Sequence, residues 1–128
     1  MIIFPTEATV LSVIDGDTIF IHDGSKVRYL GINTPERGKP FYEQALEANR
    51  KLVEGKKIKL EYDDYKKDQY DRILAWVFVD GKNASEEIVK LGLAPVDLYS
   101  HRKPLIYQDQ LFKAQEEAKK SKLGLWSL

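Results

Sequence analysis

The chain has 128 residues, 43% of them hydrophobic and 31% charged, which is typical of a soluble globular protein, and we expect a single, monomeric domain over residues 1–128. Lysine plus arginine and aspartate plus glutamate are equal at 20 each, which excludes a global basic field, so any surface that binds a polyanion must be local. Cysteine is absent, which excludes disulfides, thiolate metal sites and cysteine nucleophiles.

The sequence also gives expectations about location. No apolar run reaches the length of a membrane span, so we expect no membrane association. Residues 1–10 lack the basic segment and long apolar core of a signal peptide. We therefore expect a cytoplasmic protein for the chain as written, or a secreted or anchored one if a leader was removed.

The first third of the sequence predicts three short β-strands. Apolar or alternating runs cover residues 8–14, 18–22 and 26–32. The first two are separated by Asp-Gly-Asp at 15–17, and the next two by Asp-Gly-Ser at 23–25. Both triplets are strong hairpin signals, so the three strands should form a meander.

The third predicted strand carries an arginine on its apolar side. Arg28 shares a face with Leu30 and Ile32, and the strand then breaks into the polar turn Asn-Thr-Pro-Glu at 33–36. A buried arginine needs an anion. One explanation is an ion pair with an aspartate of the 15–17 turn; the other is a phosphate, which the guanidinium fork can hold with two hydrogen bonds.

Residues 41–55 change to a helical period. The stripe expected to face the core consists of Phe41, Ala45, Ala48 and Leu52. Gly55 is suited to end the helix. Alternating residues then predict strands over 57–63 and 72–81, and another Asp-Gly closes the second of these strands.

Two further helices are predicted near the C-terminal end. Asn83 and Glu86 have capping-box spacing for a short helix over 84–92. Its expected core-facing residues are Ala84, Ile88 and Leu91. A longer helix is predicted over about 105–121. The apolar stripe of this longer helix consists of Tyr107, Leu111, Ala114 and Ala118.

The order of predicted elements is β-β-β-α-β-β-α-α. Five short strands with a helix after the third favour a β-rich α+β fold, a five-stranded OB-type Greek-key barrel with three helices. A segregated α+β sandwich is the main alternative.

Asp15 and Asp17 flank a glycine between the first two predicted strands. Taken alone, this arrangement indicates a tight turn. However, Asp17 lies at the end of a strand beside the one that leads to Asn33 and Thr34, so their oxygen atoms can converge. Hard divalent cations bind carboxylate, amide and carbonyl oxygens. Without a set of histidines or thiolates, an all-oxygen site indicates calcium or magnesium.

Two further residues extend this group. Arg72 lies at the start of the fifth predicted strand, beside Tyr70 and Asp71, where an arginine most often forms a weak surface ion pair. Glu36 follows Pro35 and so lies in a rigid turn. A metal-binding carboxylate, two arginines and a further carboxylate are together suited to phosphodiester hydrolysis. The cations neutralise the phosphate, and the last carboxylate positions or deprotonates water.

Four stretches in this order and spacing resemble the staphylococcal nuclease (thermonuclease) family: VIDGDT, VRYLGINTPE, DQYDRILAWVFVDGKNASEEIVKLGLA and AQEEAKKSKLGLW. The resemblance extends from about Ala8 to Ser127. It implies an OB-fold barrel with three helices and an endo- and exonucleolytic enzyme that acts on DNA and RNA, preferably single-stranded. It also implies dependence on one calcium ion, cleavage of the bond to the 5′ oxygen, and 3′-phosphate products.

The resemblance also implies roles for residues that contact the substrate. Arg28 and Arg72 match the two arginines that hold the phosphate and stabilise a phosphorane-like transition state. Glu36 matches the glutamate assigned as general base. Tyr70 matches a tyrosine near the substrate phosphate, and Tyr99 is available to stack on a base.

The metal residues match the family with one exception. Asp17 matches the calcium aspartate, and Thr34 matches the residue whose backbone carbonyl binds calcium. Asn33 occupies the position of a second aspartate, so one negative charge is missing and we expect weaker calcium binding unless water or Asp15 compensates. Gln69 replaces a lysine on the phosphate side, which reduces the local positive charge.

Two alternatives to an enzyme remain at this point. The first is a nuclease-fold module that binds nucleic acid or protein without cutting. Modules of that kind typically lose the arginines or the glutamate, and the sequence retains all three. The second is a folded domain whose activity is incidental.

Overall fold

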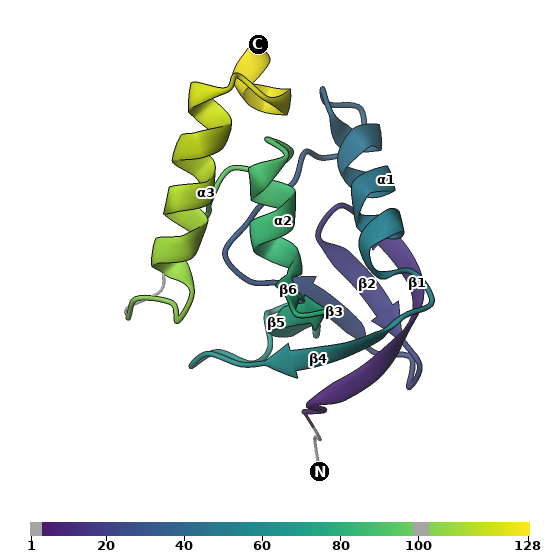
Figure 1. The fold of residues 1–128 in the computed structure, drawn as a ribbon. Helices are drawn as coiled ribbons and strands as arrows, with labels where there is room; N and C mark the ends of the chain where they lie inside the picture. Colours follow the sequence, from purple (N-terminus) through teal and green to yellow (C-terminus); the bar gives the residue numbers. More distant parts are fainter. Residues whose placement is uncertain (1–3, 99–102) are drawn as a thin grey trace.

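The computed structural model describes residues 4–98 and 103–128 (Figure 1). The strands are β1 (Glu7–Asp15), β2 (Thr18–Ile21), β3 (Lys26–Tyr29), β4 (Lys57–Glu61), β5 (Ile73–Val79) and β6 (Lys82–Asn83). The helices are α1 (Tyr42–Val53), α2 (Ala84–Lys90) and α3 (Gln108–Lys120), followed by the 3₁₀-helix η1 (Gly124–Ser127).

The first five strands form a closed barrel. β1 pairs with β2 and β4, β2 pairs with β3, and β4 pairs with β5. The parallel pairing of β3 with β5, in which Arg28 lies opposite Leu74, closes the sheet. In Figure 1 the three helices stand side by side at one end of the barrel. The predicted five-stranded OB-type barrel with three helices is therefore confirmed.

The short β6 was not predicted from the sequence. Its two residues pair with the end of β5 across a turn formed by Asp80 and Gly81. A strand of two residues is too short to show a periodic pattern. Asn83 is both its last residue and the N-cap of α2, because the Asn83 side chain accepts a hydrogen bond from the Ser85 amide. The predicted cap is therefore confirmed.

The core fills the barrel and extends beneath the helices. Ile58 and Leu60 on β4 are buried, while Lys57, Lys59 and Glu61 on the same strand are exposed, as their alternation predicts. None of the helices within residues 4–98 and 103–128 combines the length and the apolar character that crossing a membrane requires.

The predicted stripe of α1 describes its buried face only in part. The helix buries Tyr42, Ala45, Leu46, Asn49 and Val53. The prediction of Phe41, Ala45, Ala48 and Leu52 shares one member with this set; the other three are half-buried and pack against the edge of the core. The true stripe contains a polar asparagine, which a search for apolar spacing does not count.

The predicted core face of α2 was wrong at one position. Leu91, which was expected to be buried, is 52% exposed, whereas Ser85 and Val89 are buried. A helix of seven residues makes only two turns, so its last apolar residue can lie past the contact surface.

The end of β3 also differs from the prediction. The strand ends at Tyr29 instead of residue 32, because the chain turns at Gly31, which has a φ of 83°. A Cβ atom on Gly31 would lie 2.4 Å from Leu111 of α3, so only glycine fits this turn. Beyond the turn, Ile32 forms an isolated bridge with Val96.

Candidate active site

Asp17 lies in the turn between β1 and β2, and only 7% of its side chain is exposed. Its Oδ1 accepts a hydrogen bond from the Thr18 hydroxyl at 3.0 Å. Its Oδ2 accepts one from the backbone N–H of Thr34 at 2.9 Å. The second bond joins the Asp-Gly-Asp turn to the polar turn after β3, so Asp17 and Thr34 do converge.

Arg28 is bound to both of these turns. Its Nη1 lies 3.1 Å from Asp17 Oδ2 and donates to the carbonyls of Tyr29 at 2.9 Å and Ile32 at 3.0 Å. Its Nη2 donates to the side-chain oxygen of Asn33 at 3.4 Å. The expected ion pair with an aspartate of the 15–17 turn therefore exists, and the Asp17 and Asn33 oxygens lie against one guanidinium.

The donor atoms in this cluster are all oxygens. Asp17 supplies a carboxylate, Asn33 an amide oxygen on an exposed side chain, and Thr34 a backbone carbonyl. No group of three or more His, Cys, Asp or Glu in the described part of the chain could hold a metal. The set fits a hard cation such as calcium, with water or a bound phosphate as further ligands, and lacks the nitrogen or sulfur ligands of a zinc site.

Asp15 borders this cluster and has an unusual acidity. Its Oδ1 accepts a hydrogen bond from the Asp17 amide at 3.3 Å. Burial, together with a side-chain hydrogen bond with Asp17 and the negative charge of Asp17, raises the pKa of Asp15 to about 6, although the bond from the Asp17 amide acts in the opposite direction. The Asp15 carboxylate is therefore mostly charged only above this pH.

Arg72 lies one residue before β5. Leu74, two residues further along the chain, pairs with Arg28, so Arg72 immediately precedes the strand that runs beside Arg28. Its Nε donates to Asp68 Oδ2 at 2.7 Å, which is the ion pair expected for an arginine in this loop. The Arg72 guanidinium also lies 5.4 Å from the ring centroid of Tyr70, whose side chain is exposed.

The carboxylate that holds Arg72 is itself stabilised in its charged form. Burial disfavours ionisation of Asp68, but hydrogen bonds from Arg72 and from the Tyr70 amide outweigh it and hold the pKa of Asp68 below its ordinary value. Asp68 therefore keeps Arg72 oriented at neutral pH.

Glu36 lies two residues after Thr34 on an exposed turn. The Glu36 carbonyl accepts a hydrogen bond from the Lys39 amide at 3.0 Å, which closes the turn. The side chain faces solvent, so its carboxylate is accessible to water. Tyr99, the residue expected to stack on a base, lies outside the described residues.

The segment that leads to residue 99 runs beside the candidate site. The backbone N–H of Asp97 donates to the Gly31 carbonyl at 2.8 Å, and the backbone N–H of Asn33 donates to the Pro95 carbonyl at 3.4 Å. On α3, the buried Gln115 accepts a hydrogen bond from the Val96 amide at 2.8 Å. Residues 95–97 are therefore fixed between the polar turn and α3.

Sequence reasoning missed one buried residue behind the site. Asn49 of α1 is fully buried and donates from Nδ2 to the Asp15 carbonyl at 2.9 Å. Its Oδ1 accepts from the Tyr29 hydroxyl at 2.7 Å. A single polar residue in an amphipathic helix is usually exposed, so the sequence carried no signal of this contact.

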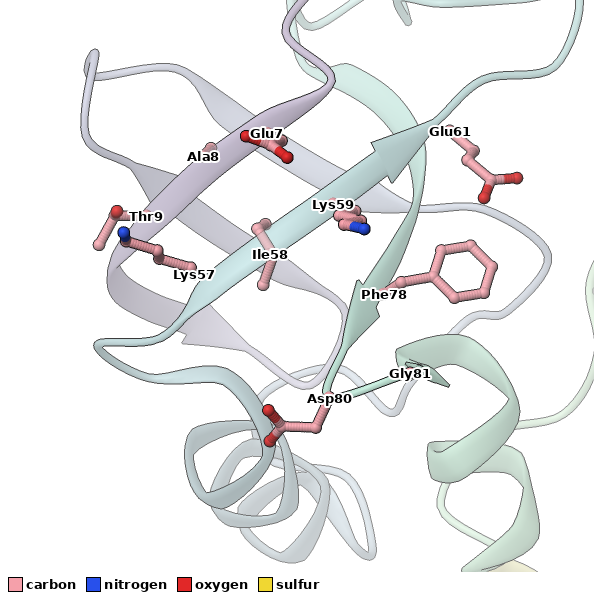
Figure 2. A pocket seen from close by; sticks show the side chains of 10 residues that line it. All are labelled: Glu7, Ala8, Thr9, Lys57, Ile58, Lys59, Glu61, Phe78, Asp80 and Gly81. Atoms are coloured by element: carbon pink, nitrogen blue, oxygen red, sulfur yellow. The ribbon is translucent and has the colours of Figure 1, made fainter.

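A separate open hollow lies on the outer face of the barrel (Figure 2). β1, β4 and the end of β5 form it, and its charged side chains have both signs: Glu7, Lys57, Lys59, Glu61 and Asp80. None of the candidate site residues within the described ranges lines this hollow.

Comparison with known protein families shows to which family this chain belongs. The family described as "Staphylococcal nuclease homologue" matches residues 26–128. The chain belongs to this family. The part of this chain that matches the staphylococcal nuclease family includes β3 and the helices α1, α2 and α3. It also includes Arg28, Asn33 and Thr34 of the cluster described above.

Curated relatives in the staphylococcal nuclease family cover nearly all of this chain. Endonuclease YncB of Bacillus subtilis (strain 168) is 43% identical over 129 residues, which is 93% of this chain and 61% of that protein. SPbeta prophage-derived endonuclease YokF of the same organism is 41% identical over 131 residues, 94% of this chain and 44% of that protein. A thermonuclease of Staphylococcus hyicus is 35% identical over 127 residues, 92% of this chain and 74% of that protein. The chain thus spans about half the length of the two Bacillus relatives.

Proposed function

We propose that the chain is a calcium-dependent nuclease that hydrolyses phosphodiester bonds of DNA and RNA, with a preference for single strands. The observation that carries this proposal is the cluster around Asp17. There, Arg28 contacts both Asp17 and Asn33, and the Thr34 amide bonds to the Asp17 carboxylate. The names of the relatives, endonuclease and thermonuclease, support the same class of reaction.

The calcium ion would be held by the Asp17 carboxylate, the Asn33 side-chain oxygen and the Thr34 carbonyl. It would supply positive charge next to a non-bridging phosphate oxygen. Only Asp17 among these three groups is charged, and Arg28 already compensates that charge. Affinity in this chain therefore depends strongly on oxygen atoms from water or from the substrate.

The two arginines neutralise the phosphate. Asp17 fixes Arg28 and Asp68 fixes Arg72 before any substrate arrives, so little side-chain freedom is lost on binding. The exposed ring of Tyr70 lies 5.4 Å from the Arg72 guanidinium and further limits its movement. Charge that develops on the phosphate oxygens then meets donors that are already oriented.

In this mechanism Glu36 is the general base for the attacking water. Its carboxylate accepts one proton while the water oxygen forms a bond to phosphorus. The bond from phosphorus to the 5′ oxygen breaks, and that oxygen takes a proton from a solvent water molecule and leaves as a 5′-hydroxyl. The phosphoryl group remains as a 3′-phosphate on the other product. We assign Tyr99 to stacking on a nucleotide base.

The chemistry of the product ends tests this proposal. After limited digestion of denatured DNA with calcium, the new ends should be 5′-hydroxyls, which polynucleotide kinase labels without prior phosphatase treatment. The complementary ends should be 3′-phosphates, which block extension by a polymerase. Products that carry 5′-phosphates instead would show that a different bond is cut and would reject the assigned mechanism.

A second candidate function is binding of nucleic acid without cleavage. The observation that favours it is that both arginines are already paired with carboxylates, Arg28 with Asp17 and Arg72 with Asp68. A binding module would hold single-stranded DNA equally well in calcium and in chelator and would leave the DNA intact over hours with calcium. A nuclease would shorten it.

A further inference from the structure

The Asp15–Asp17 turn is attached to α1 by a fully buried asparagine. Asn49 is inaccessible to solvent, and its side chain makes two hydrogen bonds to different strands. Nδ2 donates to the Asp15 carbonyl at 2.9 Å, and Oδ1 accepts from the Tyr29 hydroxyl at 2.7 Å. Because the Asp15 carbonyl can only accept, the amide nitrogen must face it, so this side chain has one orientation.

Tyr29 fixes the other side of the asparagine. Its ring is fully buried, and burial raises the pKa of Tyr29 strongly, so the hydroxyl stays protonated and acts as the donor. The backbone amide of the same residue donates to the Asp17 carbonyl at 2.8 Å. The Asp17 amide in turn donates to the Asp15 carboxylate. Tyr29, Asp17, Asp15 and Asn49 therefore form a closed ring of hydrogen bonds.

α1 also limits the space around the turn. Ala45 lies one helical turn before Asn49 on the same face of α1. A Cβ atom on Gly16 would lie 2.8 Å from the Ala45 Cβ and 2.8 Å from the Thr34 Cγ2. Gly16 is thus held between α1 and the polar turn, and the turn cannot shift toward either without a clash.

We propose that Asn49 is a positioning residue for the metal-binding site, one that acts through the Asp15–Asp17 turn to set the location of the Asp17 carboxylate. This inference rests on the proposed calcium-dependent function. Residues that orient metal ligands without touching the metal typically affect affinity by about 10-fold to 100-fold. Asp17 is the one charged group among the three proposed ligands. If Asp17 is displaced, no second carboxylate compensates for the lost interaction with the metal.

The test uses two variants of the ring and two matched controls. Asn49→Leu keeps the approximate volume and removes both hydrogen bonds, while the milder Tyr29→Phe removes only one and keeps the bond to Asp15. The control Tyr62→Phe removes a tyrosine hydroxyl that donates to the Pro5 carbonyl at 2.6 Å, at a place outside the ring. The control Ser85→Ala removes a fully buried hydroxyl that donates to the Leu30 carbonyl at 2.7 Å.

Two readouts are needed. The first is calcium affinity by isothermal titration, where we expect Asn49→Leu to weaken binding about tenfold, Tyr29→Phe to weaken it less, and the controls to leave it unchanged. The second is amide hydrogen exchange in metal-free protein at Thr34, whose N–H is bonded to Asp17. We expect exchange there to accelerate more than at buried amides of β5 in both ring variants.

The outcomes separate this inference from the proposed function. If Thr34 exchange and calcium affinity in the ring variants match the controls after correction for global stability, Asn49 is structural only and the inference is wrong. If the unaltered protein binds no calcium, the proposed function fails. Thr34 exchange then decides whether Asn49 sets the position of Asp17: faster exchange supports that role and unchanged exchange rejects it.

Discussion

The carboxylate of Asp17 and the guanidinium of Arg28 form an ion pair of 3.1 Å in which both side chains are less than a tenth exposed. The same guanidinium donates to the Tyr29 and Ile32 carbonyls and to the Asn33 side chain. Arg28 therefore serves two purposes: it compensates a buried charge, and it joins the end of β3 to the turn that follows it.

A lysine at position 28 should not replace this arginine. Arg28→Lys keeps the charge but cannot reach several acceptors in one plane, so we expect a loss of about 1–3 kcal/mol in unfolding free energy. We also expect a decrease of about 100-fold or more in the rate of DNA digestion. Urea unfolding and initial rates measure these two effects. The control Arg50→Lys changes an exposed arginine on α1, and equal behaviour of the two variants would contradict the role of Arg28.

Replacement of Glu36 should lower the nuclease activity and leave the stability of the fold almost unchanged. Because Glu36 is exposed, Glu36→Gln should change the unfolding free energy by less than about 0.5 kcal/mol. Loss of the proton acceptor should lower kcat by about 100-fold to 10,000-fold. The matched control is Glu54→Gln, an exposed glutamate at the end of α1. A Glu36→Gln protein with unchanged kcat would remove Glu36 from the mechanism.

A second carboxylate should strengthen metal binding. Asn33→Asp adds a negative charge beside the Asp17 and Thr34 ligands, and we expect calcium affinity to increase about tenfold, equivalent to about 1.4 kcal/mol. Isothermal titration with calcium measures the change. Equal or weaker binding by the variant would mean that the Asn33 side chain does not contact the ion.

Asp68 predicts a pH-dependent contribution to stability. Its pKa in the fold lies below the ordinary value of 3.8, so the charged form stabilises the protein above that pH, and this contribution is lost as pH falls through the folded-state pKa. Asp68→Asn keeps an acceptor for the Tyr70 amide but loses the ion pair with Arg72. We expect the variant to be less stable by about 1 kcal/mol at neutral pH, and this difference to shrink as the pH falls below the ordinary pKa of the carboxyl group.

Urea unfolding across this pH range measures the difference between the two proteins. The control Asp64→Asn, which changes an exposed aspartate, should show no comparable dependence on pH. A constant difference between Asp68→Asn and the unaltered protein at all pH values would contradict the ion-pair assignment.

The strands and turns of the barrel were predicted well from the sequence because they depend on interactions between residues close together in the chain. The Asp-Gly turns and the alternation of β4 depend on residues near in sequence, and the structure has them where they were expected. The burial of Asn49 depends on Tyr29, 20 residues away, and on Asp15, 34 residues away. Contacts between residues so far apart in sequence do not affect the spacing of apolar residues along a helix. The predicted apolar stripe of α1 therefore did not include Asn49.

The candidate site was predictable to a similar degree. The convergence of Asp17 with Thr34 follows from the hairpin order, and the structure joins them by a hydrogen bond. The early end of β3 does not follow from the alternating pattern, which continues to Ile32, although the chain turns at Gly31 where α3 leaves no room for a side chain. Strand ends that depend on distant packing are not visible in an alternating pattern.

The most direct test of the central claim is digestion of denatured DNA as the free calcium concentration is changed in one preparation. The account predicts that digestion proceeds with calcium, stops when a chelator is added and resumes when calcium is restored in excess. Each of these steps should be visible in the same reaction by the release of acid-soluble nucleotides. Digestion that continues unchanged in chelator, or DNA that stays intact with calcium, would contradict a calcium-dependent nuclease.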